Sequence, residues 1–415
     1  MWACRSNLPS AGKSDSRRLH HFDGVRGWAA LAVVVFHSTT ELFGGVIPFL
    51  TTGWLGLFND GLLAVYIFFV LSGLVLSNQF FAAGNLARIR ITALGRYVRL
   101  TIPIAAASFL TFILMKSGFL FNHDAAVILH REDWLGWFYQ FPASLPSYLR
   151  FAFYAVYFDF DSHTAYDVVL WTMPYELIGS FLVFAMVALF GTSRRTRIAS
   201  CAAAVVLFWK LNPMYLTFVY GYLIADLNTV IAGSAITKGR LGNAIGLALI
   251  AAATAISIQL RNEPPEVPIY AFAGACVVLA PVFSSWLRAL LSCAVSRWLG
   301  RISFPLYLTH MAVICTFASF GIVMLDGRSW SPAAIAAAVV PPTVVIALVL
   351  AQAFEPVERL AILCAHRFAG LVMRPDTVPH AAPPQPSFAQ SRGSEPFRSY
   401  DASRPSTRAP ARSQS

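Results

Sequence analysis

The chain has 415 residues, of which 57% are hydrophobic and only 12% are charged, and its mean hydropathy is +0.61. This composition excludes an ordinary soluble protein and predicts a polytopic membrane protein. The formal net charge of +11 does not indicate nucleic-acid binding, because the basic residues lie at the ends of apolar segments and in the C-terminal tail rather than on one face.

The first apolar segment carries three ionisable side chains. The stretch FDGVRGWAALAVVVFH at 22–37 opens with Asp23 and Arg26 and ends at His37. We expect it to form the first membrane-spanning helix, with Arg26 and His37 on one face about 16 Å apart, because eleven residues are close to three helical turns. An ionisable side chain within a span usually faces a partner, a cavity or a substrate. His37 is therefore either a functional group or a buried histidine hydrogen-bonded to a neighbouring helix.

Nine further apolar segments follow, so the predicted fold is an all-α membrane bundle of about ten transmembrane helices. Their expected ranges are 61–81, 101–121, 168–190, 198–209, 213–227, 241–258, 268–287, 302–325 and 332–354. Lysines and arginines gather in alternate intervals, at 82–100, 191–197, 238–240 and 288–301. The positive-inside rule therefore predicts that both termini are cytoplasmic.

The intervals outside the spans divide the chain further. Residues 1–21 are expected to be a cytoplasmic segment without a cleavage site. The acidic interval 122–167 is expected to be an external loop, with aromatic patches at 134–141 and 148–158 forming surface-lying helices. The membrane domain thus covers 22–356. A basic juxtamembrane segment at 357–373 precedes a Pro-, Ser- and Arg-rich tail at 374–415, which we expect to be disordered.

The six cysteines form no CxxC and no Cys/His metal spacing. We therefore expect neither a disulfide framework nor a metal site.

Three further polar groups lie at the ends of expected spans. Arg96 and Arg99 are three residues apart on one helix face, where they can hold phosphates or act as ordinary positive-inside anchors. Glu176 lies near the external end of the fourth span, where it either pairs with a membrane histidine or is solvated.

The third group is Ser303, Tyr307 and His310, which share a helix face and can also be polar contacts between helices.

In this order the motifs resemble the acyltransferase 3 family of integral membrane O-acyltransferases. The resemblance covers about residues 20–355 and rests on FDGVRGWAALAVVVFH (22–37), FFVLSGLVLS (68–77), GRYVRLTIP (95–103), LWTMPYEL (170–177) and LGRISFPLYLTH (299–310). Two positions depart from the family pattern. Val25 stands where a leucine is usual before the arginine, and Phe304-Pro305 replaces the commoner dipeptide, which resembles Tyr-Ser or Tyr-Pro.

The resemblance implies a ten-helix core in a membrane, by our expectation a bacterial inner membrane. It implies transfer of an acyl group, commonly acetyl, from cytoplasmic acyl-CoA to a hydroxyl of a carbohydrate or other exported acceptor, as in polysaccharide O-acetylation. It also implies that Arg26 and His37 are the functional pair of the first helix and that Arg96 and Arg99 serve the donor. The expected partners are this acceptor and membrane lipids, with no nucleic acid.

The chemistry of the residues agrees with this implication. Acyl transfer to an alcohol needs a base, and a histidine with an ordinary pKa of about 6.5 suits that role. His37 either deprotonates the acceptor directly or first accepts the acyl group covalently. The alternative is a secondary transporter or exporter, which would also have about ten helices, although we find no repeat between the halves of the chain.

Overall fold

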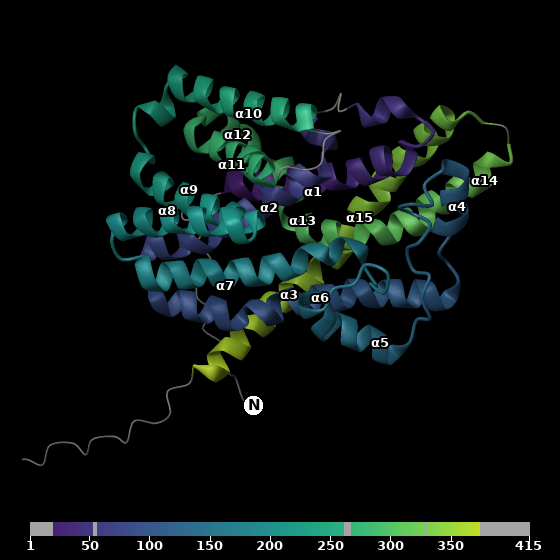
Figure 1. The fold of residues 1–415 in the computed structure, drawn as a ribbon, viewed down its shortest axis with the longest axis horizontal. Coiled ribbons are helices and arrows are strands. Elements are labelled where there is room, and N and C mark those ends of the chain that lie inside the picture. The colour runs from purple at the N-terminus through teal and green to yellow at the C-terminus, as the bar shows by residue number, and fades with distance from the viewer. Residues whose placement is uncertain (1–19, 53–55, 261–266, 329, 374–415) are drawn as a thin grey trace, which may run out of the picture. The chain divides into compact units, whose positions relative to one another are not determined.

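The computed structural model describes residues 20–52, 56–260, 267–328 and 330–373. Every regular element in these ranges is a helix, which confirms the predicted all-α class (Figure 1). The longer helices are α1 (His20–Phe36), α2 (Gly61–Ala83), α3 (Leu86–Ser117), α7 (Met173–Phe190), α8 (Arg194–Leu211), α9 (Leu216–Ile231), α10 (Arg240–Leu260), α11 (Val267–Phe283), α13 (Ala294–Val313) and α15 (Pro332–Val372).

Shorter elements connect these helices. The short α-helices are α4 (Asn122–Leu129), α5 (Leu145–Arg150), α6 (Val156–Phe158), α12 (Ser285–Leu291) and α14 (Ser319–Asp326). Three wide π-helical turns occur, at η2 (His37–Glu41), η5 (Phe151–Ala155) and η9 (Ile314–Ala318). Tight 3₁₀ turns form η3 (Pro48–Thr51), η4 (Gly56–Asn59), η6 (Val168–Thr172), η7 (Pro213–Tyr215) and η8 (Ile236–Lys238).

Seven helices of the described chain are long and apolar enough to cross a membrane, or eight if α11 and α12, bent by 101°, count as one broken span. They are Gly61–Phe81, Leu86–Ser117, Val168–Phe190, Pro213–Ile231, Arg240–Leu260, Ala294–Asp326 and Pro332–Val372. Three of the ten expected spans are therefore not among these seven. One is α11, which counts only as part of the bent pair. The other two are α1, which has 17 residues before the π-turn begins, and α8, which contains four arginines and lysines.

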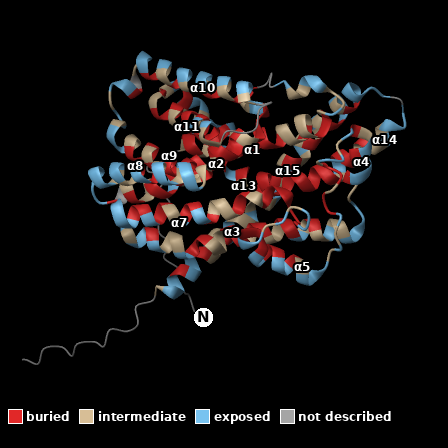
Figure 2. Cartoon of the chain, viewed as in Figure 1, coloured by how far each residue is buried: buried red, intermediate tan, exposed pale blue. Residues whose placement is uncertain are grey.

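The central helices of residues 20–373 are α1, α2 and α13. Helix α1 packs along α13, α2 packs along α9, and α15 contacts both α3 and α13. In Figure 2 the buried residues are concentrated on these central helices, whereas α8 and α10 expose much of their surface. Polar side chains on α1 and α13 are thus enclosed by other helices, which is the environment that a reactive site needs.

Helix α1 approaches α13 closely because a glycine faces it. A Cβ atom on Gly27 would lie 2.5 Å from the backbone nitrogen of Gly300, so no larger residue fits without separating the helices. Two side-chain bonds cross the same contact: Trp28 Nε1 donates to Ser296 Oγ at 3.0 Å, and Arg26 Nη2 donates to the Gly300 carbonyl at 3.2 Å. The contact fixes the two helices that carry His37 and His310.

The expected basic loop at 82–100 is largely helical instead. Gly84 ends α2 in a left-handed conformation, and the Asn85 side chain accepts a hydrogen bond from Ala87 N at the start of α3. Helix α3 therefore begins at Leu86, well before the expected span at 101–121, and Pro103 lies inside it. Arginines mark a membrane boundary by their charge, but they are also good helix formers. The helix that contains them therefore continues past the boundary that their charge predicts.

The expected external loop is only partly as predicted. The patch at 148–158 is helical, through α5, η5 and α6, but the patch at 134–141 forms successive turns and no helix. Similarly, the juxtamembrane segment at 357–373 is the last part of α15. The expected tail at 374–415 and most of the segment at 1–21 lie outside the described residues.

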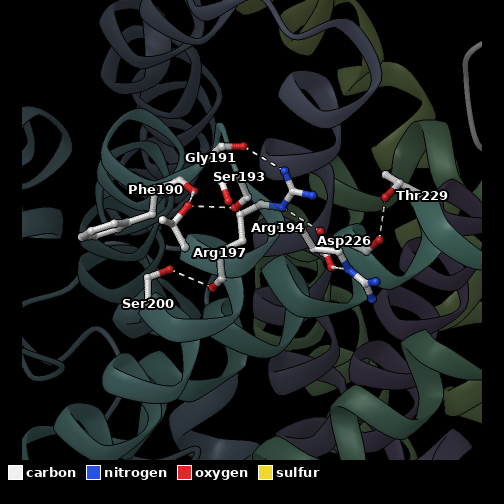
Figure 3. Close-up of polar contacts among 9 residues, drawn as sticks. Phe190, Gly191, Ser193, Arg194, Arg197, Ser200, Asp226 and Thr229 are labelled. Carbon is white, nitrogen blue, oxygen red and sulfur yellow. Dashed lines mark hydrogen bonds and ion pairs between the residues drawn. The ribbon is translucent and has the colours of Figure 1, made fainter.

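The expected basic loop at 191–197 contributes to an ion cluster that joins α8 to α9 (Figure 3). Asp226 on α9 is buried and accepts hydrogen bonds from Arg197 Nε at 2.7 Å and from Arg194 Nε at 3.3 Å. Arg197 also donates to the Gly191 carbonyl at 2.9 Å. These arginines lie in the first turn of α8, so they serve as structural partners of a buried carboxylate as well as basic residues between spans.

Candidate active site

Two predicted site residues from opposite ends of the sequence meet inside the bundle. His37 Nδ1 lies 2.9 Å from His310 Nε2, and the two rings are nearly parallel, with centroids 5.1 Å apart. His310 is completely buried, whereas His37 is partly exposed. His37 therefore has the expected partner on a neighbouring helix, but it also keeps an accessible face.

The hydrogen bonds of His310 determine the neutral form of the pair. His310 Nδ1 lies 2.7 Å from the Tyr307 carbonyl and 3.2 Å from the Leu306 carbonyl. Because carbonyl oxygens only accept, this nitrogen carries the proton, and Nε2 of a neutral ring must accept. His37 then donates through Nδ1, which leaves its Nε2 unprotonated. That nitrogen is a free base, and it has the lone pair that proton abstraction or acyl transfer requires.

The chain carries His37 at the first residue of the π-turn η2. Threonine side chains bond to backbone oxygens around the turn, since Thr39 Oγ1 donates to the Val35 carbonyl at 2.6 Å and Thr40 Oγ1 donates to the Leu50 carbonyl at 3.0 Å. Single π-turns are rare within helices and are frequent at functional sites. The sequence showed no periodicity change that would have located this one.

Arg96 and Glu176 form a second cluster, closer to the other end of the bundle. Their side chains make an ion pair in which Arg96 is 9% and Glu176 13% exposed. Arg96 Nε donates to Ser180 Oγ at 2.9 Å, and Ser72 Oγ donates to Glu176 at 2.6 Å. Glu176 is therefore paired with an arginine, and not with the membrane histidine or the solvent that the sequence left as alternatives, because α3 packs beside α7.

This cluster lines a pocket of about 150 Å³. Arg26 and Arg99 also line it, and Phe68, Phe69 and Phe304 supply an apolar wall. Arg26 lies 3.6 Å from Asp23, one turn earlier on α1. The pocket thus brings together the predicted arginines of α1 and α3, which are the groups in this part of the chain best suited to bind an anion.

Tyr307 lies between the pocket and the histidine pair. It lines the pocket, and its ring centroid is 6.0 Å from that of His310. Its hydroxyl donates to the Val169 carbonyl at 2.5 Å and lies 2.9 Å from the Thr172 hydroxyl. Ser303, predicted on the same face, is buried and donates to the Gly300 carbonyl of its own helix at 2.9 Å, so it does not contact the pair.

A buried acid supports the turn that holds Tyr307. Asp167 precedes η6, and its Oδ1 accepts a weak hydrogen bond from Val169 N at 3.4 Å, while Oδ2 has no hydrogen-bond partner. Burial raises the pKa of the Asp167 carboxyl well above its ordinary value. The sequence reasoning did not select Asp167, because an acid in an acidic loop gives no signal of burial.

Two other site residues were missed. Ser72, which bonds to Glu176, lies within the FFVLSGLVLS motif and could have been selected from it. Trp134, whose ring is stacked on His37, lies in the interval 122–167, and only the fold brings it to His37.

Comparisons with known proteins agree with this arrangement. A family model described as an acyltransferase domain matches residues 19–352. The O-acetyltransferase PaAT-1 of Phomopsis amygdali is 26% identical over 385 residues, which cover 73% of this chain and 74% of that protein. No solved structure matches the chain.

The membrane-length helices and the matching family define the class as a multi-pass membrane protein. The chain belongs to the acyltransferase 3 family, as its motifs predicted, and it is an acyltransferase. The family assignment thus decides against the alternative of a transporter or exporter.

Proposed function

We propose that this enzyme transfers an acyl group, commonly acetyl, from cytoplasmic acyl-CoA to a hydroxyl of a carbohydrate or other exported acceptor, with His37 as the base or the acyl carrier. The observation that carries the proposal is the hydrogen-bonded pair of His37 and His310, because it leaves His37 Nε2 as a free base within a membrane bundle. The O-acetyltransferase activity named for the fungal relative supports the transfer of acetyl to oxygen.

In the direct route His37 Nε2 takes the proton of the acceptor hydroxyl, and the oxygen attacks the thioester carbonyl. The tetrahedral intermediate then expels the CoA thiolate, so that one C–O bond forms and one C–S bond breaks. The imidazolium returns the proton to the thiolate. Throughout, His310 Nε2 accepts a hydrogen bond from Nδ1–H of His37 and holds the ring in the productive tautomer, as an orienting group does for other histidine bases.

In the covalent route His37 Nε2 attacks the thioester carbonyl first, so that an N-acyl bond forms as the C–S bond breaks and the CoA thiolate leaves. The acceptor hydroxyl then attacks this acyl group, the C–N bond breaks to restore the imidazole, and the hydroxyl proton goes to the thiolate. The two routes differ in one measurable product. Only the covalent route lets membranes exposed to labelled acetyl-CoA, without acceptor, retain label on the protein after denaturation at neutral pH.

On the donor side we assign different roles to the arginines of the pocket. Arg26 and Arg99 are the proposed contacts for the phosphates of acyl-CoA. Arg96 is already bound by Glu176 and Ser180, so we assign it the role of holding α3 and α7 together behind the donor. The host membrane remains a prediction, as does its bacterial origin.

The test compares histidine variants in membranes supplied with labelled acetyl-CoA, scoring ester-linked label in the native acceptors. His37→Ala should lose transfer by about a hundredfold or more, since general-base catalysis contributes about 10²–10⁴-fold. His310→Gln should retain part of the activity, because the glutamine carbonyl can still accept from His37, whereas His310→Leu should lose more. The exposed His366 on α15 provides the control His366→Ala. Wild-type transfer in His37→Ala membranes would refute the proposal.

A further inference from the structure

Two contacts tie the external interval to the π-turn that carries His37. The ring of Trp134 lies nearly parallel to the imidazole of His37, at 16° and with centroids 5.6 Å apart. Arg131 Nη2 makes an ion pair with Glu41 Oε2 at 2.7 Å. His37 and Glu41 are the first and last residues of η2. Both contacts therefore join the same helical turn to the same external segment.

The external segment is itself well ordered around these side chains. Leu135 N and Trp134 N both donate to the Arg131 carbonyl, at 2.8 and 3.2 Å. The guanidinium of Arg131 lies 5.9 Å from the Trp134 ring centroid, within the range of a cation–π contact. The segment therefore presents Arg131 and Trp134 as one unit.

The chain after η2 also lies directly against this segment. A Cβ atom on Gly45 would lie 2.6 Å from the Leu129 carbonyl oxygen and 3.0 Å from the His130 carbonyl oxygen. His130 adopts a left-handed conformation, at φ 53°, to end α4 at this point. Backbone contact at Gly45 and side-chain contacts at His37 and Glu41 thus hold this segment against η2 and the chain that follows it.

We propose that Trp134 is a positioning residue for His37 and that the ion pair between Glu41 and Arg131 holds it in place. This inference rests on the proposed function, in which His37 Nε2 is the reacting base. One hydrogen bond to His310 still allows the imidazole to tilt about its Cβ–Cγ bond. A flat ring stacked on its face removes this rotation, so that Nε2 points in one direction.

The kinetic consequence is an effect on turnover rather than on donor binding. Misplacing a reacting group by about 1 Å can cost about a hundredfold in rate. Trp134→Leu, which keeps much of the volume but loses the flat face, should lower kcat by about ten- to a hundredfold. The KM for acetyl-CoA should stay within about twofold, because the donor pocket does not include Trp134. Trp134→Phe, which keeps a flat ring, should recover most of the turnover.

The matched control is Trp137→Leu in the same segment. Trp137 contacts Phe138 and His163 and donates to the Asp133 carbonyl at 2.8 Å. This substitution removes the same kind of side chain from the same turns without removing the contact with His37. If both leucine variants lost turnover equally, the tryptophans would only be holding the loop, and the inference would be overturned.

The ion pair is tested by exchange of its charges. Glu41→Arg and Arg131→Glu should each lower kcat about tenfold, since each leaves two like charges facing one another. The double variant E41R/R131E restores opposite charges and should regain most of the lost turnover. The side chains are 22% and 20% exposed, so both orientations can be accommodated. A double variant no better than the singles would contradict the assigned role of the pair.

The same assay distinguishes this inference from the proposed function. Wild-type kcat in Trp134→Leu, with transfer abolished in His37→Ala, would overturn only the positioning role. Wild-type transfer in His37→Ala would instead refute the base. Thermal unfolding in detergent, measured for every variant, identifies any loss that comes from misfolding.

Discussion

Arg96 and Arg99 lie almost one turn apart on α3 but have different surroundings. Arg96 is buried and bound to Glu176 and Ser180, so its guanidinium is part of the protein interior. Arg99 is half-buried and lines the pocket. A lysine keeps the charge but loses the planar guanidinium with its paired N–H donors. Lysine substitutions therefore distinguish the structural role of Arg96 from the proposed donor-binding role of Arg99.

Arg96→Lys should lower the free energy of unfolding by about 1.5–3 kcal/mol, the value of a hydrogen bond to a charged group. Arg99→Lys should leave stability unchanged and raise the KM for acetyl-CoA about tenfold or more, because it loses one charge-assisted bond. Donor titrations and thermal unfolding of both variants check this, with Arg90→Lys on the exposed side of α3 as the control. Wild-type donor kinetics in Arg99→Lys would remove Arg99 from the donor site.

Most of the polar site residues could be selected from the sequence, but their partners could not. Spacing along one helix shows which side chains share a face, as for Asp23 and Arg26, which lie one turn apart and 3.6 Å from each other. It carries no information about which helices are neighbours. The sequence therefore did not predict the hydrogen bond between His37 and His310. For Glu176 it suggested a histidine or solvent as the partner, whereas the partner is Arg96. Trp134 was missed for the same reason, since only the fold brings the interval 122–167 to His37.

At the scale of elements, the contact between α1 and α13 depends on Gly27, which faces the backbone of Gly300. Gly27→Ala would require the helices to separate, at a cost of about 1–3 kcal/mol for an overpacked contact. We expect a lower unfolding midpoint together with reduced transfer, because the 2.9 Å bond between His37 and His310 joins the same two helices.

Gly370→Ala on α15 is the matched substitution, since a Cβ atom there meets nothing within 4 Å. Alanine is the better helix former by about 1 kcal/mol, so this variant should be slightly more stable and equally active. The expectation fails if the two alanine variants behave alike in unfolding and transfer.

Apolar runs located the main helices well, yet they did not define their ends. The predicted start of the third span at Thr101 is 15 residues after the start of α3 at Leu86. Hydropathy reports where a helix enters the bilayer, whereas hydrogen bonding continues into water wherever a cap and a packing partner allow. Here Asn85 provides the cap, and α15 provides the partner.

For the whole molecule, we expect the acidic interval 122–167 and the start of α3 to lie on opposite sides of the membrane. The test uses a background in which Cys4, Cys293 and Cys364 are serine, because Cys293 is exposed and Cys364 is partly so. A cysteine replacing the exposed Glu132 should react with an impermeant thiol reagent in intact cells. One replacing the exposed Ala87 should react only after permeabilisation. The reverse pattern would invert the proposed donor and acceptor sides.

Tyr307 lines the arginine-lined pocket, its ring centroid lies 6.0 Å from that of His310, and its hydroxyl is bonded to Thr172 and Val169. If the donor and acceptor lie on opposite sides, as we propose, an open path between them would also conduct protons and dissipate the electrochemical gradient of the cell. A hydrogen-bonded tyrosine at this position would then matter for the energy supply of the cell. We expect it to restrict such a path while the acyl group passes by reaction, so that a surface modification would not drain the membrane potential.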